Sequence, residues 1–412
     1  MQPIPVSEHV TWVGVIDWDL RDFHGFATPR GSTYNAYLVR GADTVALVDT
    51  VKTPFVPELL SRIEKVVDPS TIGLIVVNHV EPDHNSGLRD VIAACPNARV
   101  VASASGVRGV AEYHDGLVVE AVGADDVIDL GGVTLRFMPA PMVHWPDSMF
   151  TYCPEDRVLM CNDAYGQHLA SAERFADEVG ETLAIEELRV YYANILLPLG
   201  SQIAKALEKV VAAGWKPEVI ATSHGVIWRG DLVKTAMEAY RKWGSGDLLD
   251  KAVIVFSTMW GSTDELARTI ADALIVEGVD VEVFDLAESS LATIMREILD
   301  SRALLVGTPT LHHGMLYRVA GFLQYLRGLK PAGRVAASFG SFGWSSGATK
   351  QVDDVLADIG VNVVQEPFTQ KFRPTEAELE AARVWGTEFA AKVKEAGRSA
   401  EAGSSSAAEP EA

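Results

Sequence analysis

Two histidines and two carboxylates stand within six positions of the segment NHVEPDHNSG, which spans residues 78–87. These side chains belong to His79, Glu81, Asp83 and His84. Imidazole and carboxylate groups at this spacing either bind a metal ion or form a charged turn. The apolar run IGLIVV precedes them, so we expect the segment on the loop that leaves a buried strand, where a rigid scaffold can present ligands. An extended backbone would turn residues 79, 81 and 83 to one side and His84 elsewhere.

Three later segments each place one further ligand type directly after an apolar strand. His144 follows GVTLRFMPAP, Asp163 ends the run VLMCND, and His224 follows VIATS. Any one of them alone is more often a buried polar residue with ordinary partners. Because all four segments lie in the same half of the chain, they favour a shared metal site over incidental polar turns.

Length and composition restrict the classes of protein that this chain can represent. Its 412 residues exceed one ordinary core, so two domains are expected. With 35 Lys+Arg against 56 Asp+Glu, the formal charge of −21 disfavours nucleic acid and anionic membranes as partners. The three cysteines form no CxxC pair and fit a reducing compartment. We see no signal peptide and no apolar run of membrane-spanning length, and therefore expect a cytoplasmic protein.

The two halves of the chain differ in their pattern of strands and helices. From residue 252, five apolar strands alternate with helices, which predicts a doubly wound parallel sheet. The first half has short strands, among them a hairpin turning at residues 41–43, and predicts α/β structure with sheet-on-sheet packing. We expect domains at residues 1–247 and 252–396, followed by a disordered tail at 397–412 that has almost no large apolar residue.

The segment FSTMWGSTDELA, residues 256–267, joins the first strand of the second domain to its first helix. Hydroxyl groups and backbone N–H groups at a helix N-terminus can cradle a phosphate. Neither a GxGxxG pattern nor a Walker lysine is present, which favours a mononucleotide over a dinucleotide or a nucleoside triphosphate. An ordinary helix cap is the alternative for this segment alone.

The ligand order H-x-E-x-D-H, followed by His, Asp and His, resembles the metallo-β-lactamase superfamily. Its zinc hydrolases have histidine where this chain has Glu81. An added carboxylate favours iron or manganese, and zinc has no redox chemistry. Together with a flavodoxin-like second half, the chain resembles the flavodiiron proteins (A-type flavoproteins) to about residue 395. This resemblance implies an N-terminal metallo-β-lactamase-like αββα domain followed by a flavodoxin-like domain.

The resemblance also implies roles for individual residues. One iron would bind His79, Glu81 and His144, the other would bind Asp83, His224 and His84, and Asp163 would bridge the two. His24 and Tyr192 are expected near the bound oxygen species, although both also fit ordinary, partly buried polar positions. FMN would be held by three loops, whose residues are Ser257, Thr258, Met259, Trp260, Gly261, Ser262, Thr263, Pro309, Thr310, Leu311, Gly314, Gly340, Ser341, Phe342, Gly343 and Trp344. The pair His312-His313 departs from the asparagines common before this glycine.

By the same resemblance we expect an oxidoreductase that reduces O2 to water, NO to N2O, or both. Electrons would pass through FMN from an external donor, either a rubredoxin-like protein or reduced coenzyme F420. The family forms head-to-tail dimers or dimers of dimers, which we expect here. Two other classes remain open: a zinc hydrolase with an accessory flavodoxin domain, and an electron-transfer flavoprotein whose first half is only structural.

Overall fold

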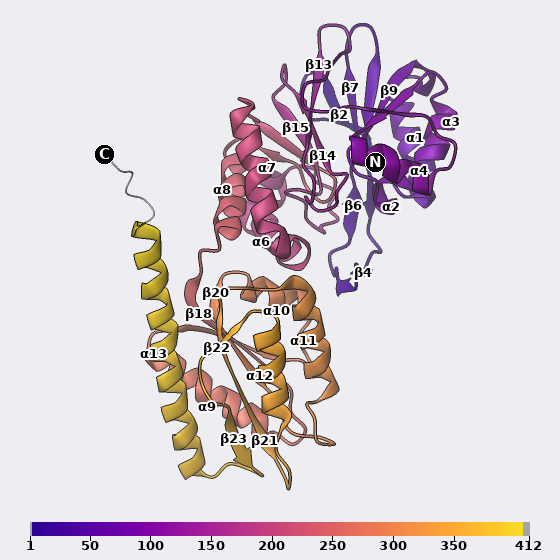
Figure 1. Cartoon of the computed structure of the whole chain (residues 1–412). Coiled ribbons are helices and arrows are strands. Elements are labelled where there is room, and N and C mark those ends of the chain that lie inside the picture. The colour runs from indigo at the N-terminus through magenta and orange to yellow at the C-terminus, as the bar shows by residue number, and fades with distance from the viewer. Residues whose placement is uncertain (1, 407–412) are drawn as a thin grey trace. The chain divides into compact units, whose positions relative to one another are not determined.

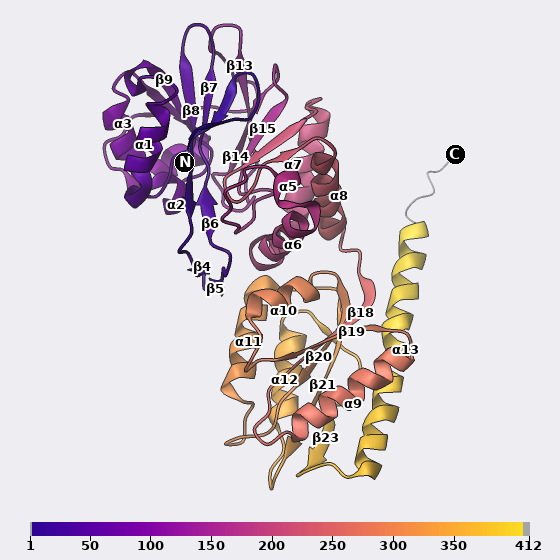
Figure 2. The ribbon, with the colours of Figure 1, turned by 180° about the vertical axis from the view of Figure 1, so that it is seen from behind.

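The structure is a computed structural model that describes residues 2–406, and Figures 1 and 2 show it from two opposite sides. The described chain divides into two compact units. The first contains the residues up to Tyr192 together with Leu199–Ser245, and the second contains Ala193–Pro198 with the residues from Gly246 onward. Each unit has its own sheets and its own hydrophobic core.

The first unit contains a seven-stranded sheet in the order β1-β2-β7-β8-β9-β10-β11. Strands β8 to β11 run parallel to one another, whereas β1, β2 and β7 pair antiparallel. Arg40 pairs with Val45, so the expected hairpin turns at residues 41–44. The strands are β1 (Ile4–Pro5), β2 (Val10–Trp12), β7 (Tyr37–Arg40), β8 (Val45–Val48), β9 (Ile72–Val77), β10 (Arg99–Ala102) and β11 (Val119–Ala121).

A second, six-stranded sheet in the first unit has the order β12-β13-β14-β15-β16-β17 and is antiparallel except between β15 and β16. One buried cluster joins residues of both sheets, including Val48 and Val76 from the first and Phe137 and Met160 from the second. The sheets therefore pack face to face. The strands are β12 (Val127–Asp129), β13 (Thr134–Pro139), β14 (Met149–Cys153), β15 (Val158–Asn162), β16 (Val219–Thr222) and β17 (Trp228–Arg229).

Helices cover the outer side of each sheet in the first unit (Figures 1 and 2). Leu59, Leu88 and Val110 belong to a buried cluster that packs α1, α3 and α4 against the first sheet. The expected metallo-β-lactamase-like αββα arrangement is thus confirmed. The helices are α1 (Val56–Ile63), α2 (Pro82–Asn85), α3 (Leu88–Ala94), α4 (Ala104–Tyr113), α5 (Ala176–Val179), α6 (Glu181–Tyr191), α7 (Gly200–Ala212) and α8 (Asp231–Ser245). Two further pairs of strands are β3 (Val15–Asp17) with β6 (Ser32–Tyr34) and β4 (Asp22–Phe23) with β5 (Phe26–Ala27).

The second unit is a parallel sheet in the order β19-β18-β20-β21-β22, the flavodoxin-like strand order. This confirms the doubly wound sheet expected from the alternating pattern. Apolar residues of α9 and α13 pack on one face, and α10 to α12 lie on the other (Figures 1 and 2). The elements are β18 (Leu249–Phe256), α9 (Ser262–Val276), β19 (Asp280–Asp285), α10 (Leu291–Ile298), β20 (Ser301–Gly307), α11 (Tyr317–Leu329), β21 (Val335–Phe342), α12 (Ala348–Asp358), β22 (Asn362–Val363), β23 (Phe368–Lys371) and α13 (Glu376–Ser406).

The fifth predicted strand is interrupted in the structure. Its first part, β22, pairs with the start of β21, and its second part, β23, pairs with the end of β21. Pro367 lies between the two parts. Because proline has no backbone N–H to donate, it interrupts the pairing, and β23 then brings Phe372 to the carboxyl end of the sheet.

The C-terminal helix is longer than the sequence predicted. Helix α13 continues to Ser406, so the prediction of a disordered tail is wrong for residues 397–406, while 407–412 lie outside the described residues. A β-carbon at Gly397 would lie 2.8 Å from Oδ1 of Asp250 on β18, which shows that the helix still packs on the domain there. Tertiary packing thus supports the helix at Gly397, where a stretch of small and polar residues begins. No helix among the described residues is both long and apolar enough to cross a bilayer.

Gly340 lies where β21 passes the backbone of the neighbouring strand. A β-carbon there would lie 1.9 Å from the carbonyl oxygen of Thr308. We expect Gly340→Ala to lower the free energy of unfolding by about 3 kcal/mol or more, because two paired backbones cannot separate. The matched control is Gly321→Ala in α11, where no described atom beyond the neighbouring residues and the backbone of the same helix lies within 4 Å of the added carbon. The control should raise that free energy by about 0.5–1 kcal/mol. Denaturant titration measures both, and equal midpoints would contradict the expectation.

Candidate metal centre

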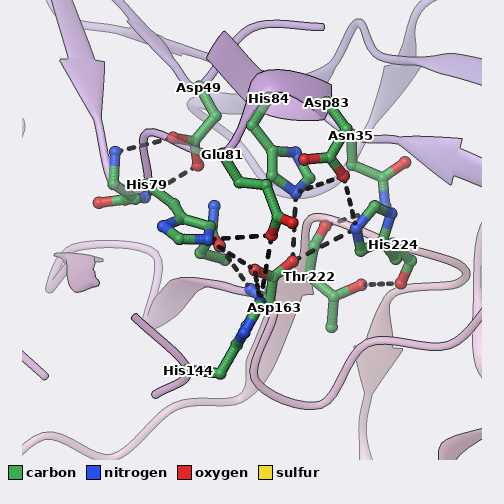
Figure 3. A network of polar contacts seen from close by, with 12 residues as sticks. Asn35, Asp49, His79, Glu81, Asp83, His84, His144, Asp163, Thr222 and His224 are labelled. Atoms are coloured by element: carbon green, nitrogen blue, oxygen red, sulfur yellow. Dashed lines mark hydrogen bonds and ion pairs between the residues drawn. The ribbon is translucent and has the colours of Figure 1, made fainter. Parts of the chain in front are cut away.

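The segment NHVEPDHNSG leaves β9 and then forms the short helix α2 (Pro82–Asn85). The helical turn corrects the expectation of an extended backbone that would point His84 away. Asp83 and His84 both lie on this turn, and their side chains both reach the polar cluster shown in Figure 3. His79, which comes before the turn, has no exposed surface.

The other three ligand candidates come from the second sheet, where it faces the end of β9. His144 lies on the loop between β13 and β14, Asp163 directly follows β15, and His224 lies two residues after β16. Asn35 secures the last of these loops, because its Nδ2 donates to the carbonyl oxygens of Thr222 at 2.9 Å and Gly225 at 3.1 Å. Loops at the strand ends of two sheets thus bring together residues that are far apart in the sequence.

The seven candidates form two adjacent groups whose ligand atoms lie within 4.8 Å of one another in each group. One carboxylate oxygen of Asp163 contacts imidazoles of the first group, and its other oxygen contacts imidazoles of the second group. Its Oδ2 lies 3.4 Å from Nε2 of His79 and 3.2 Å from Nε2 of His144. Its Oδ1 lies 3.1 Å from Nε2 of His84 and 3.3 Å from Nε2 of His224. The groups are His79, Glu81, His144 and Asp163, and Asp83, His84 and His224.

Several ligand atoms of these groups are buried without any hydrogen bond. They include both carboxylate oxygens of Asp83, Oδ2 of Asp163 and Nε2 of His144. Their contacts are ion pairs within the cluster, such as Oδ2 of Asp83 with Nε2 of His224 at 3.1 Å. Buried carboxylate and imidazole atoms rarely lack hydrogen bonds, and burying a charge without them is costly. Imidazole groups lie on both sides of the Asp163 carboxylate. This arrangement fits a pair of metal ions that Asp163 would bridge.

The charges of the cluster are mutually dependent. Burial opposes protonation of His84, but the carboxylates of Asp83 and Asp163 raise its pKa to about 9. Burial likewise opposes protonation of His144, whose pKa is raised to about 9 by Asp163 and Glu81. The same imidazoles hold the pKa of Asp163 well below its usual range despite burial. The carboxylates are therefore ionised and available to cations.

The first histidine of the cluster is oriented by a carboxylate from outside it. His79 donates its Nδ1–H to Oδ2 of Asp147 at 2.9 Å, and the backbone N–H of Val80 donates to the same oxygen at 2.7 Å. His224 is fixed similarly, since its Nδ1–H donates to the carbonyl oxygen of Thr33 at 2.7 Å. In both histidines the Nδ1 contact turns Nε2 toward the ligand cluster. Metal-binding histidines are commonly oriented in this way, by a hydrogen bond from the ring nitrogen that does not bind the metal.

We expect Asp147→Asn to lower iron affinity by about 10–100-fold, because it weakens the contact that orients His79. Iron and FMN content per chain would be measured after dialysis against increasing chelator. Circular dichroism should stay unchanged, and FMN content should also stay unchanged because Asp147 lies in the other unit. Retention of iron equal to the unmodified protein would show that Asp147 does not position the ligand.

His24 and Tyr192, expected beside the metal site, differ in where the structure places them. His24 lies there: its Nε2 is 2.5 Å from Oε1 of Glu81. The Tyr192 ring instead packs 5.0 Å from Tyr240 and 5.2 Å from Trp243. Tyr191 takes the expected place, with its ring centroid 6.0 Å from that of His224. Helix α6 ends at Tyr191, and a π-helical turn begins at Tyr192. The two rings therefore point in different directions, and the ring of Tyr191 is the one that faces the cluster.

His168 is a further residue of this region that the sequence reasoning missed. It is buried, its ring lies 5.1 Å from that of His224, and its Nδ1 is 3.0 Å from Oγ of Ser32. Burial holds its pKa well below the usual range, so the imidazole is neutral. Its position five residues after Asp163 is the signal in the sequence that could have indicated it.

The second unit has a separate cavity of about 760 Å³ at the carboxyl ends of its parallel strands. Gly261, with a φ of 88°, precedes α9, and its N–H donates to Oγ1 of Thr258 at 3.1 Å. The indole rings of Trp260 and Trp344 line the cavity although each residue is 92% exposed. An apolar slot with two exposed aromatic rings beside a helix N-terminus fits a flat ring that carries a phosphate.

Most residues predicted for the flavin site line this cavity. The lining includes Thr258, Met259, Trp260, Ser262, Pro309, Thr310, Leu311, Ser341, Phe342, Gly343 and Trp344. Ser257, Gly261, Thr263, Gly314 and Gly340 do not line it. Thr263 is buried with its Oγ1 3.2 Å from Oγ of Ser341, so it supports the wall. The structure adds five lining residues, which are His312, His313, Ser345, Phe372 and Arg373. The last two directly follow β23, the second part of the interrupted fifth strand.

Comparison with known proteins agrees with both sites. Residues 33–225 match the family described as ODP family beta lactamase, and residues 254–386 match the flavodoxin family. A nitric oxide reductase of Moorella thermoacetica is 40% identical over 95% of this chain and 99% of its own length. The solved flavodiiron protein of Giardia intestinalis is 34% identical, with a TM-score of 0.92 over 97% of this chain and 98% of that chain. This chain is a flavodiiron protein.

Other relatives of this flavodiiron protein carry different names. A coenzyme F420H2 oxidase of Methanothermobacter marburgensis is 38% identical over 94% of this chain and 98% of its own length. The solved rubredoxin oxygen:oxidoreductase of Desulfovibrio gigas is 37% identical, with a TM-score of 0.93 over 96% of this chain and 99% of that chain. Family membership and the fit of both sites assign FMN and a non-haem diiron pair as the cofactors of this oxidoreductase.

Proposed function

We propose that this flavodiiron protein reduces dioxygen, nitric oxide or both at a diiron pair held between its two ligand groups. The observation that carries the proposal is the Asp163 carboxylate, each of whose oxygens faces imidazoles of a different group. Two metals that share one bridging ligand can hold both atoms of a diatomic molecule. The alternative zinc hydrolase finds no specific support, because Glu81 occupies the position of a zinc-binding histidine.

The ligand set supplies three carboxylates and four imidazoles for two irons. His79, Glu81 and His144 would hold one ion, and Asp83, His84 and His224 would hold the other. When bound, two ferrous ions and one reduced FMN supply the four electrons needed to convert dioxygen to water, and nitric oxide reduction to N2O needs two. The carboxylates offset most of the charge of the two cations, which keeps the site stable in a buried environment.

Residues around the ligand set control water and protons. His24 donates Nε2–H to Oε1 of Glu81 and is 33% exposed, so it can move protons between solvent and the site. The neutral ring of His168 and the buried ring of Tyr191 close the side next to His224. Burial raises the pKa of Tyr191 well above its usual value, so its hydroxyl stays protonated and can donate a hydrogen bond.

The test is amperometric consumption of each gas by the iron- and FMN-loaded protein with a reduced donor. We expect consumption of at least one gas, with N2O as the product from nitric oxide, and its loss when iron is removed. Metal analysis must find iron in the active protein. Zinc without iron, together with no consumption of either gas, would favour the hydrolase alternative.

We also propose an external electron donor, a homo-oligomeric assembly and a cytoplasmic location for this protein. Relatives named for rubredoxin and for coenzyme F420H2 support these two reductants as donors, and the gas assay would compare them directly. A head-to-tail homodimer, or a dimer of dimers, would be tested by light scattering of the loaded protein. Buried free thiols at Cys95, Cys153 and Cys161 support a reducing, cytoplasmic environment.

A further inference from the structure

The turn that follows β20 has a histidine at each of its two central positions. Leu311 and Gly314 exchange both of their backbone hydrogen bonds at 2.9 Å, which closes a two-residue turn. His312 has a φ of 51° and His313 a φ of 61°, the signature of a type I′ turn. This turn favours asparagine, aspartate and glycine, and histidine is also enriched at positive φ. The backbone of the turn therefore accepts histidine at both positions, and what the pair contributes depends on where the imidazoles lie.

Both imidazoles line the FMN cavity, and the turn is held in place from two sides. Nδ1 of His313 lies 3.2 Å from Oγ of Ser345, on the loop that also provides the Trp344 indole. On α12, Nε2 of Gln351 donates to the carbonyl oxygen of His313 at 3.1 Å. The turn is thus fixed against the cavity wall.

The cavity has an uneven distribution of charge. Among its lining residues in the described chain, His312, His313 and Arg373 are the ones that can carry charge, and each of these charges is positive. Gln351, the α12 residue in contact with the turn, is neutral. The carboxylate of Glu265 on α9 lies 3.7 Å from Nε of Arg373. A guanidinium keeps its charge at all relevant pH values, whereas histidine is the side chain whose charge can change within the physiological pH range.

We propose that His312 and His313 control the FMN reduction potential in a pH-dependent manner, by placing positive charge beside the reduced ring. The inference rests on the proposed function, because it requires FMN in this cavity. Two electrons from the donor and one proton from water leave the flavin ring with a negative charge, which a protonated imidazole stabilises. No bond forms between imidazole and flavin. Lower pH, which favours the protonated imidazole, therefore makes the flavin easier to reduce.

The experiment compares the FMN-loaded full chain with the double variant His312→Asn/His313→Asn. Asparagine tolerates positive φ, so the turn is preserved while both titratable groups are removed. Midpoint potentials would be measured by spectroelectrochemical titration at about pH 6 and about pH 8, on either side of the ordinary imidazole pKa. We expect the variant potential to be more negative than that of the unmodified protein at the lower pH, and equal to it at the higher pH.

Arg373→Gln is the matched control, since it removes a cation of the same cavity that does not titrate. Its potential should differ from the unmodified value by the same amount at both pH values. A double variant that matches the unmodified protein at both pH values, or differs from it equally at both, would overturn the inference and leave the proposed function intact. Loss of FMN from the double variant alone would also overturn it, by assigning the pair to binding. An unmodified protein that binds no FMN would overturn the proposed function as well.

Discussion

Asp163→Asn is expected to lose most of the iron and to lower gas reduction by on the order of 10²-fold or more, while FMN content stays unchanged. The carboxylate stands between the two ligand groups, with Oδ2 3.2 Å from Nε2 of His144 and Oδ1 3.1 Å from Nε2 of His84. An amide is a weaker, neutral ligand with only one oxygen, so it cannot bridge two cations. Both irons should therefore be affected by this single substitution.

The matched control for Asp163→Asn is Asp156→Asn. Asp156 is also a hydrogen-bonded carboxylate of the first unit, but its partners are Ser7 and the Nδ1–H of His9 rather than the ligand groups. Iron and FMN would be counted per chain by elemental analysis and absorbance. The control should keep both cofactors. Full iron content in Asp163→Asn would contradict a bridging role, and loss of FMN would indicate general unfolding instead.

Glu81→His is expected to shift metal binding from iron toward zinc and to reduce gas consumption to background. The substitution removes one of three carboxylates and adds a third imidazole to the first group, as in the zinc hydrolases of the superfamily. Oε1 of Glu81 also holds His24 at 2.5 Å, so the same change releases that side chain. Because zinc has no redox chemistry, a zinc-loaded site cannot reduce either gas.

Metal competition measures this change in selectivity. The unmodified protein, Glu81→His and the control Glu120→His would be loaded from equal concentrations of Fe²⁺ and Zn²⁺ under anaerobic conditions. Glu120 is exposed on β11 and pairs with Arg99 at 2.8 Å, so its substitution should not alter metal content. A Glu81→His protein that keeps iron and still consumes gas would show that this carboxylate does not select the metal.

Local sequence determined the type of each site because chemistry-bearing residues directly follow apolar strands. His79, Glu81, Asp163 and His224 all come within four residues of a strand end in the structure, and the alternating second half forms the parallel sheet that its pattern predicts. The substitution of Glu81 for histidine was also visible at this level. Residue type and strand pattern are properties of short segments, so they can be read without knowing how the segments pack.

Tertiary structure alone decided which side chains face the sites. Sequence could not choose between Tyr191 and Tyr192, because a change of helical phase at the end of α6 turns one ring inward and the other away. It assigned no position to Asp147, whose contact with His79 spans 68 residues. Phe372 and Arg373 reach the FMN cavity only through the interrupted fifth strand. Such contacts depend on how distant segments pack together, a property that no short stretch of sequence contains.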